Sequence, residues 1–517
     1  MVENMFEMLV NGLVIVFTPH TLLMIVFAVF LGVVFGALPG ISNTMAVALG
    51  IPFTYGMEPI QSIVFLTAIF CASVTGGGMP AILFKIPGVP ASAPTTYDGY
   101  PMAQQGKAGK ALGIQLTVSA VGGIVAALVM LFLCRPLTTA AVSFGPAELF
   151  AVAFLGLSIL TTLDTDNICR TIISGLIGLL LACVGLDPLL GVPRMTFGIL
   201  DLNGGLEMVP ILIGFFAVTE VLKQTGKQTM MSEDLHIKHM KTDLPTLKEL
   251  VSLRWTILRG SLIGCFIGVL PGAGATIAAF LGYSVEQKAS KHPEKFGTGC
   301  PEGIAAPETA NSAAAGCSMI PLLSLGIPGG AAAAVMMSAL TLKGVQMGPM
   351  LLVRQPEYLS SMFVGMLVTC IVMVVAAMLL AKIFVRVLHI PYSSLGPLII
   401  MISTIGAFAT KNVSVDVITM VAAGLIGFIF VSCRFNVSAM ILGLVLGKIC
   451  ESNLRRAYII APGNNLWDTT WNVFKQPLKI APIPLTGIIM LVCIGMLVFP
   501  VIKPIIEKAW KKRGKSA

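Results

Sequence analysis

Residues 36–40 read Gly-Ala-Leu-Pro-Gly, and residues 268–272 read Gly-Val-Leu-Pro-Gly. Both pentapeptides lie in apolar surroundings, and each has a further glycine four residues upstream, Gly32 and Gly264. Proline removes a backbone donor and clashes with the preceding helical turn, while glycine accepts conformations that other residues avoid. Each pentapeptide is therefore predicted to break a helix, and the recurrence predicts that the chain consists of two related halves.

Two further pairs of segments support this division. Ile-Pro-Gly at 86–88 recurs at 327–329, and Ser-Gly-Leu-Ile-Gly at 174–178 resembles Ala-Gly-Leu-Ile-Gly at 423–427. The offsets of 232, 241 and 249 residues increase in order, as expected of duplicated halves with small insertions. The predicted organisation is a first membrane repeat (1–222), a cytoplasmic linker (223–255), a second membrane repeat (256–450), and a C-terminal part (451–517) with a loop, an extra membrane helix and a basic cytoplasmic tail.

The composition indicates that the surrounding solvent is the lipid bilayer. Of the 517 residues, 56% are hydrophobic and 11% are charged, against about 25% charged residues in ordinary soluble domains. No Asp, Glu, Lys or Arg occurs in 8–57, 309–342 or 480–502. The predicted fold is an all-α integral membrane protein with Pro-Gly-broken helices, re-entrant hairpins and about 12 membrane segments.

The distribution of basic residues predicts the topology. The net charge of +9 comes from clusters in the linker and in the tail after 502, so it does not indicate nucleic-acid binding. The positive-inside rule places both clusters in the cytoplasm, and the N-terminus, which lacks Lys and Arg, outside. The first half then crosses the membrane an odd number of times, so the repeats are predicted to be inverted, as in many secondary transporters.

The motifs of common enzyme classes are missing from the sequence. It contains no P-loop, no HExxH and no GxSxG motif. With only five histidines and scattered single cysteines, a transition-metal site is not expected. We therefore predict a protein without enzymatic activity or cofactor, in which an ion gradient or a partner protein drives transport.

Small polar residues follow the predicted helix breaks. A broken helix in a membrane offers free carbonyl groups to a cation and N–H groups to an anion. Each half also has a second polar segment before its Ile-Pro-Gly. The predicted substrate-binding residues are Ser42, Asn43, Thr44, Thr75, Gly76, Gly77, Lys85, Asn311 and Ser312. The predicted ion-binding residues are Pro39, Gly40, Gly272, Gly274, Thr276 and Glu308.

Several of these residues have an alternative interpretation. The glycines at 76–78 allow either close approach of a ligand or close helix packing. Lys85 either pairs with an anionic substrate or extends to the membrane interface. Glu308 either takes part in ion coupling or caps a helix. Asp98, within Tyr-Asp-Gly-Tyr-Pro at 97–101, is predicted to stabilise a turn in a polar loop.

These motifs resemble those of the large membrane subunit of the bacterial tripartite tricarboxylate transporters, over nearly the whole chain. The segments that carry the resemblance are 36–40, 86–88 with 97–109, 268–276, 290–297 and 306–316. The resemblance implies carboxylate import across the bacterial inner membrane, driven by a Na⁺ or H⁺ gradient. It also implies two partners, a small membrane subunit and a periplasmic solute-binding protein.

The sequence departs from the family pattern beside the predicted site. Lys85 stands where the family usually has Asn, and Asn311-Ser312 stands where it often has Asn-Asn. The Ser-Asn-Thr run at 42–44 resembles motifs of divalent-anion/sodium symporters. A stand-alone sodium/dicarboxylate symporter is therefore the alternative, and a channel or membrane scaffold is the alternative from another class.

Overall fold

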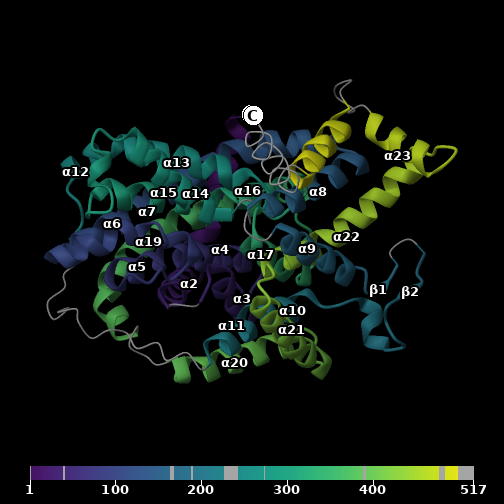
Figure 1. Ribbon diagram of the computed structural model, residues 1–517, viewed down its shortest axis with the longest axis horizontal. Coiled ribbons are helices and arrows are strands. Elements are labelled where there is room, and N and C mark those ends of the chain that lie inside the picture. The colour runs from purple at the N-terminus through teal and green to yellow at the C-terminus, as the bar shows by residue number, and fades with distance from the viewer. Residues whose placement is uncertain are drawn as a thin grey trace, which may run out of the picture. The chain divides into compact units, whose positions relative to one another are not determined.

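The computed structural model describes residues 2–38, 41–163, 168–187, 190–225, 243–272, 274–387, 392–476 and 484–498. Within these ranges the chain is helical apart from short connections and one two-stranded antiparallel sheet (Figure 1). It divides into two compact units, one formed by 1–136, 209–270 and 274–428, and the other by 137–208, 271–273 and 429–517. The first unit therefore draws on both halves of the sequence.

The elements of the first unit come from three stretches of chain. Its N-terminal elements are α1 (Val2–Val16), α2 (Pro19–Ala37), α3 (Asn43–Thr54), α4 (Pro59–Gly76), α5 (Gly78–Phe84), η1 (Pro90–Ser92), α6 (Thr95–Met102), η2 (Ala103–Lys107) and most of α7 (Ala108–Val142). The middle stretch holds α10 (Met208–Ile213), η4 (Gly214–Val218), α11 (Thr219–Gln224), α12 (Leu247–Ser252) and α13 (Arg254–Val269). The last stretch holds α14 (Gly274–Ala289), η5 (Pro293–Lys295), α15 (Pro301–Cys317), α16 (Met319–Leu325), α17 (Ala331–Leu342), α18 (Pro349–Arg354), α19 (Glu357–Val387), α20 (Tyr392–Ala409) and most of α21 (Ser414–Ser432).

The second unit is built around α22 (Val437–Ile460), which packs against α8 (Pro146–Leu163) and α9 (Ile168–Ala182). Strands β1 (Gly185–Leu186) and β2 (Pro193–Arg194) pair in a hairpin with Gly185 opposite Arg194. Its remaining elements are η3 (Leu200–Gly204), α23 (Leu466–Lys475) and a helix over Leu485–Val498. Arg194 binds Glu451 of α22 at 2.5 Å, and Arg455 binds Asp187 at 2.6 Å, which ties the hairpin to this helix.

Six helical segments of the described chain are long and apolar enough to cross a membrane. They are Pro19–Ala37, Pro59–Phe84, Thr95–Val142, Glu357–Leu379, Ser414–Ser432 and Val437–Ile460. Five further apolar helices are shorter, at 10–17 residues. The protein is therefore a multi-pass, almost wholly α-helical membrane protein, as predicted. The number of crossings and the inverted orientation of the halves stay predictions.

The paired breaks recur as local structure. In the first half α2 packs along α4, and in the second half α13 packs along α15. The residue after α2, Leu38, has φ −78° and ψ 115°, and the residue after α13, Leu270, has φ −75° and ψ 120°. In both segments the backbone thus leaves the helix in the same extended conformation, directly before the Pro-Gly pair.

Glycines at equivalent positions bring each helix pair into contact. A Cβ on Gly32 would lie 2.6 Å from the carbonyl oxygen of Ile69, and Gly36 meets the carbonyl of Ser73. In the second half Gly264 meets the carbonyl of Ala310, and a Cβ on Gly268 would lie 2.5 Å from that of Ala314. Small residues at such crossings allow backbones in membranes to pack closely.

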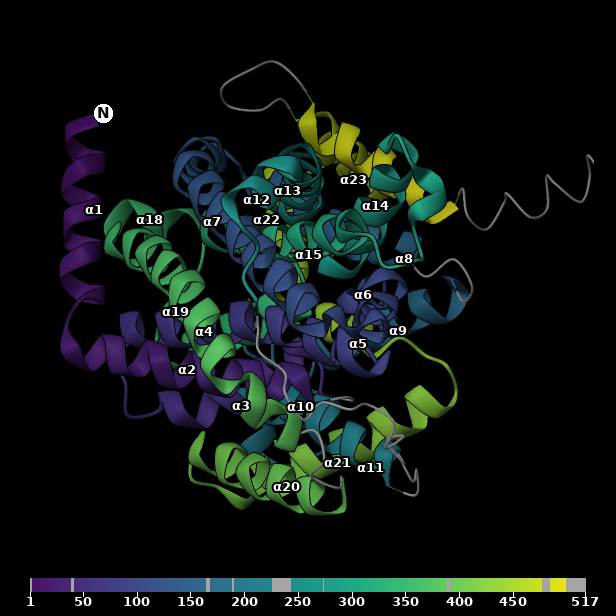
Figure 2. The same ribbon diagram turned by 90° about the vertical axis from the view of Figure 1, so that its left-hand side faces the viewer.

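The hairpins that follow also match. Ile86 N donates to the carbonyl of Pro80 at 3.4 Å, and Ile327 N donates to that of Pro321 at 3.2 Å. Helix α5 ends at Lys85 and α16 ends at Gly326, both in the left-handed region at φ 59° and 71°. Helix α19 packs on both helices of the first pair, α2 and α4 (Figure 2). The two hairpins therefore share these local conformations, while the division of the chain into two repeats stays a prediction.

Candidate functional site

A fully buried carboxylate on α15 forms the centre of the candidate site. Glu308 has no exposed surface. Its Oε1 accepts a hydrogen bond from Thr95 Oγ1 at 2.6 Å, and its Oε2 accepts from Gln115 Nε2 at 3.2 Å and Ser119 Oγ at 3.1 Å. Thr95 belongs to α6, and the other two donors belong to α7. The first half of the chain thus supplies the neutral hydrogen-bond donors for an acid of the second half.

No cationic side chain of the described residues pairs with Glu308. A charged carboxylate away from water is costly unless a counter-charge or several donors stabilise it. Three neutral donors stabilise a charged Glu308 in part, and a proton on the carboxyl group or a bound cation would offset the remaining charge. Both are properties of an ion-coupling site.

A glycine makes room for this carboxylate. A Cβ on Gly78, the first residue of α5, would lie 2.9 Å from Glu308 Oε1 and 2.6 Å from Gln115 Nε2. Gln115 Nε2 also donates to the backbone carbonyl of Thr75 at 2.8 Å, at the end of α4. The break between α4 and α5 therefore lies directly against Glu308.

Next to the carboxylate lie buried polar atoms that have no hydrogen-bond partner among the described residues. Asn311 has no exposed surface, and neither its Nδ2 nor its Oδ1 is bonded; the same holds for Ser312 Oγ. Residues three and four positions apart share a helix face, so both lie beside Glu308 on α15. Thr75 Oγ1 and Gln115 Oε1 are unpartnered as well. Unpaired polar atoms are costly in a protein interior, so these atoms are available to a small polar ligand.

The opposite face of α15 is packed against glycines, which determines where the polar face points. Gly260 and Gly264 of α13 meet the carbonyls of Ala306 and Ala310, and Gly282 of α14 also meets these two residues. Helices α13, α14 and α15 lie together in Figure 1. With its small-residue face against these two helices, α15 directs Glu308 towards its donors on α6 and α7 and towards Gly78 of α5.

The start of α15 is fixed by a second buried acid. Asp98 Oδ1 accepts from the backbone N–H groups of Gly297, Gly299 and Cys300, each at 2.9 Å, and Oδ2 accepts from Tyr283 Oη at 2.9 Å. The prediction of a turn within a polar loop is wrong for Asp98. It lies in α6, fully buried, and holds a loop about 200 residues further along the chain. A carboxylate at this position also suits the positive end of the α15 dipole.

The structure shows the local contacts of several residues predicted after the breaks. Ser42 caps α3, since its Oγ accepts from Met45 N at 3.1 Å, and Asn43 Oδ1 accepts from Thr44 N at 2.9 Å. Gly272 and Gly274 have φ angles of 83° and 71°, which confirms a break between α13 and α14. Thr276 is half-buried on α14. Pro39 and Gly40 lie outside the described residues.

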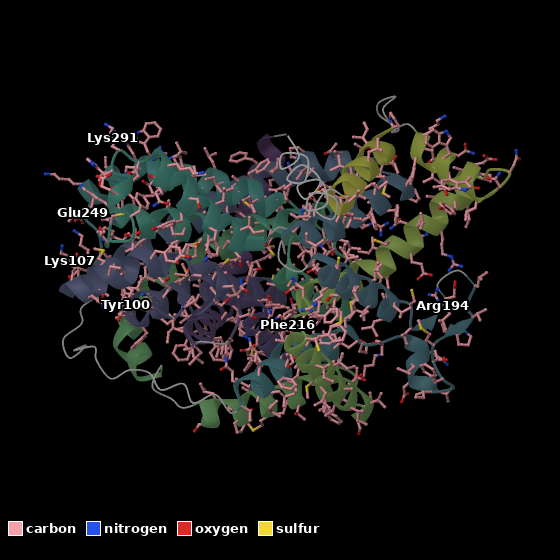
Figure 3. All side chains as sticks on the ribbon, viewed as in Figure 1. Tyr100, Lys107, Arg194, Phe216, Glu249 and Lys291 are labelled. Carbon is pink, nitrogen blue, oxygen red and sulfur yellow. The ribbon has the colours of Figure 1, made fainter. Side chains whose placement is uncertain are left out.

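The remaining predicted residues divide between packing and surface positions. Gly76 and Gly77 lie against Val33 and Val89, which favours the packing interpretation of these glycines. Lys85 is exposed, and its Nζ lies 5.8 Å from the ring centre of Tyr100, which Figure 3 labels on α6. Of the residues predicted from sequence, the structure thus brings together Thr75, Glu308, Asn311 and Ser312.

Four further residues of the site are not among the predicted ones: Thr95, Gln115, Ser119 and Gly78. Gln115 was detectable in principle, because it is an amide within the uncharged stretch 111–134. Thr95 and Ser119 carry no such signal, since hydroxyl groups in membrane helices usually bond to their own backbone.

Comparison with known proteins gives the family of the chain. Residues 22–442 match the model of the tripartite tricarboxylate transporter TctA family. The chain belongs to this family. It is 35% identical over 447 residues to an uncharacterised 52.8 kDa protein in the TAR-I ttuC′ 3′ region of Agrobacterium vitis, which covers 86% of this chain and 89% of that protein.

A second relative from Agrobacterium vitis, an uncharacterised protein in the TAR-II ttuC′ 3′ region, is 38% identical over 201 residues. That match covers 39% of this chain and 83% of the relative. No solved structure matches this TctA-family chain.

Proposed function

We propose that this TctA-family protein is the large permease subunit of a binding-protein-dependent secondary transporter that imports tricarboxylates or related carboxylates. Transport is driven by a Na⁺ or H⁺ gradient, with Glu308 as the coupling group. The observation that carries the proposal is the pairing of a buried carboxylate, which has only neutral donors, with an amide on the same helix face whose atoms are all unpartnered. Such a pairing suits an ion and a polar substrate that bind together.

The proposed assembly includes a small membrane subunit and a periplasmic solute-binding protein. The chain lies in the bacterial inner membrane with its N-terminus in the periplasm and its C-terminus in the cytoplasm. Its halves are inverted, with the 223–255 linker on the cytoplasmic side. The clusters of Lys and Arg in the linker and tail support this topology.

The topology is tested by labelling a cysteine introduced at 230 in the linker. The thiol should react with a membrane-impermeant maleimide only after the cells are permeabilised. Labelling of intact cells from the periplasmic side would contradict the proposed orientation.

The site is tested in two steps, because the substrate is unidentified. Carboxylates are first screened against the cognate binding protein by calorimetry, and uptake of the best ligand is then measured with Na⁺ and pH varied separately. We expect Asn311→Ala to abolish uptake. Since it removes a buried amide without partners, it should leave the melting temperature unchanged or raise it. Asn43→Ala should also abolish uptake with expression intact.

Uptake and the amount of folded protein, measured together on these variants, distinguish a role of Asn311 in transport from a role in folding. Full uptake by both variants would contradict the assignment of the site. Loss of uptake together with loss of folded protein in Asn311→Ala would show that the amide is structural. Uptake that is independent of the binding protein would favour the stand-alone symporter.

A further inference from the structure

A groove on the first unit lies apart from the Glu308 site. It has a volume of about 420 Å³ and is lined by residues of α7, α12 and α13. Its apolar wall consists of Val125, Val129, Leu247, Leu250, Val251, Ile257, Leu258, Leu262 and Cys265, and Arg254 and Ser261 are its polar lining residues. We propose that it binds one acyl chain of an anionic phospholipid whose phosphate group contacts Arg254.

The length and lining of the groove suit a hydrocarbon chain. The groove follows α13 from Arg254 to Cys265, which at the rise of a helix is about 16 Å. Nine of its eleven lining residues are apolar, so an extended acyl chain along this length would be in contact with apolar side chains almost throughout.

The charge at one end of the groove favours an anionic headgroup. Two neighbouring basic residues are neutralised, since Arg259 binds Glu286 at 2.7 Å and Lys110 binds Glu249. Arg254 has no carboxylate partner among the described residues; its recorded contacts are the Val251 carbonyl and the Trp255 ring. An exposed, uncompensated guanidinium is a strong phosphate ligand.

The residue beside Arg254 marks the membrane interface. Trp255 is 57% exposed, and tryptophan is enriched at the headgroup level of membranes. Arg254 and Trp255 thus place this end of the groove at the lipid headgroups, while Leu258 and Leu262 continue one and two turns deeper. A lipid with its phosphate at Arg254 would extend its chain along these leucines.

A buried hydroxyl in the wall provides a second polar contact. Ser261 is 3% exposed, lines the groove, and its Oγ has no hydrogen-bond partner. It lies two turns along α13 from Arg254, in the direction in which the lipid would extend from its phosphate to its ester groups. The ester carbonyl oxygens are acceptors, so this hydroxyl has a matching partner in a lipid but none in the part of the chain that the structure describes.

Helix α12 is held in place as one wall of the groove. Its first turn has a capping box between Thr246 and Glu249, and the Lys110–Glu249 pair connects it to α7. The backbone N–H of Asp243 donates to the carbonyl of Gly109 at 3.1 Å, just before α12. The groove is therefore a preformed site, which lowers the cost of ordering it on binding.

The experiment uses the full-length protein in nanodiscs that contain a trace of photoactivatable lipid. Phosphatidylglycerol and phosphatidylcholine, each with a diazirine near the end of one acyl chain, are crosslinked and the labelled peptides mapped. We expect phosphatidylglycerol to label peptides containing Val129 or Leu262 about fivefold more than phosphatidylcholine, the effect of one basic residue at an anionic headgroup.

Matched variants distinguish this site from general lipid contact. Arg254→Gln should reduce phosphatidylglycerol labelling to the phosphatidylcholine level, whereas Arg354→Gln, on exposed α18, should not. Val129→Phe fills the groove and should reduce labelling by both lipids, whereas Leu128→Phe, at a 43% exposed neighbouring position, should not.

Equal labelling by the two lipids, or labelling unchanged in Arg254→Gln, would overturn the proposal. Protection of these peptides by a co-purified membrane protein would equally contradict it, because the groove would then belong to a protein interface.

Discussion

The two broken hairpins, α4–α5 and α15–α16, have similar backbone conformations but differ in the side chains that they contribute to the site. Both lie along a glycine-bearing helix that ends in the same extended conformation. Only α15 carries an ionisable group in its buried face, Glu308, while α4–α5 contributes the Thr75 carbonyl and the space left by Gly78. The comparison teaches that two segments with the same local conformation can carry different chemistry, and that here only one of them supplies the carboxylate.

Substitution of the glycines at the two helix crossings is expected to have the largest effect on stability. Gly36→Ala forces a Cβ into the Ser73 backbone and Gly268→Ala into that of Ala314, and each should destabilise by about 1–3 kcal/mol through overpacking. Melting temperatures in detergent, read by fluorescence-detected size exclusion, measure the loss. Gly56→Ala is the control, because no atom lies within 4 Å of its Cβ position. If Gly36→Ala and Gly268→Ala melt like Gly56→Ala, the equivalence of the two helix crossings is wrong.

The residues that follow α5 and α16, Lys85 and Gly326, both have a left-handed backbone conformation, but only one of them is glycine. Substitutions at these two positions therefore test the two hairpins separately. Lys85 adopts φ 59°, which costs a non-glycine residue roughly 1–2 kcal/mol, so Lys85→Gly should raise the melting temperature. Gly326→Ala should lower it, since its Cβ would also lie 2.7 Å from the Met347 carbonyl oxygen. We expect uptake to persist in Lys85→Gly because this side chain is exposed. Loss of uptake with folding intact would instead place Lys85 in the substrate path, as the sequence predicts.

The smallest expected effect concerns the pair that connects α7 to α12. The Lys110 ammonium holds the pKa of Glu249 below its ordinary value. A lowered folded-state pKa contributes stability above the unfolded value, and this contribution is lost as pH falls through the folded one. Lys110→Met should therefore melt slightly below wild type at pH 7 and equal to it near pH 3. A difference that persists at low pH would show that the lysine acts through packing of its stem.

The sequence was sufficient to predict the class of fold and the paired breaks, because both depend on local composition and on Pro and Gly. It also predicted Glu308 and Asn311 as site residues, and both are fully buried on α15. It could not predict the donors around Glu308, since Gln115 is 193 residues away along the chain and meets it only through long-range packing. The same holds for Asp98, whose partners at 297–300 follow it by about 200 residues.

The central claim is that Glu308 couples transport to an ion gradient. The most direct test measures accumulation of the radiolabelled ligand of the binding protein in proteoliposomes with the complete transporter, under an imposed Na⁺ gradient or an imposed pH gradient. Wild type should accumulate ligand under at least one gradient. Glu308→Gln, which keeps the shape of the side chain, should be folded with an unchanged or higher melting temperature and accumulate under neither. Gradient-driven accumulation by Glu308→Gln at the wild-type level would contradict the account.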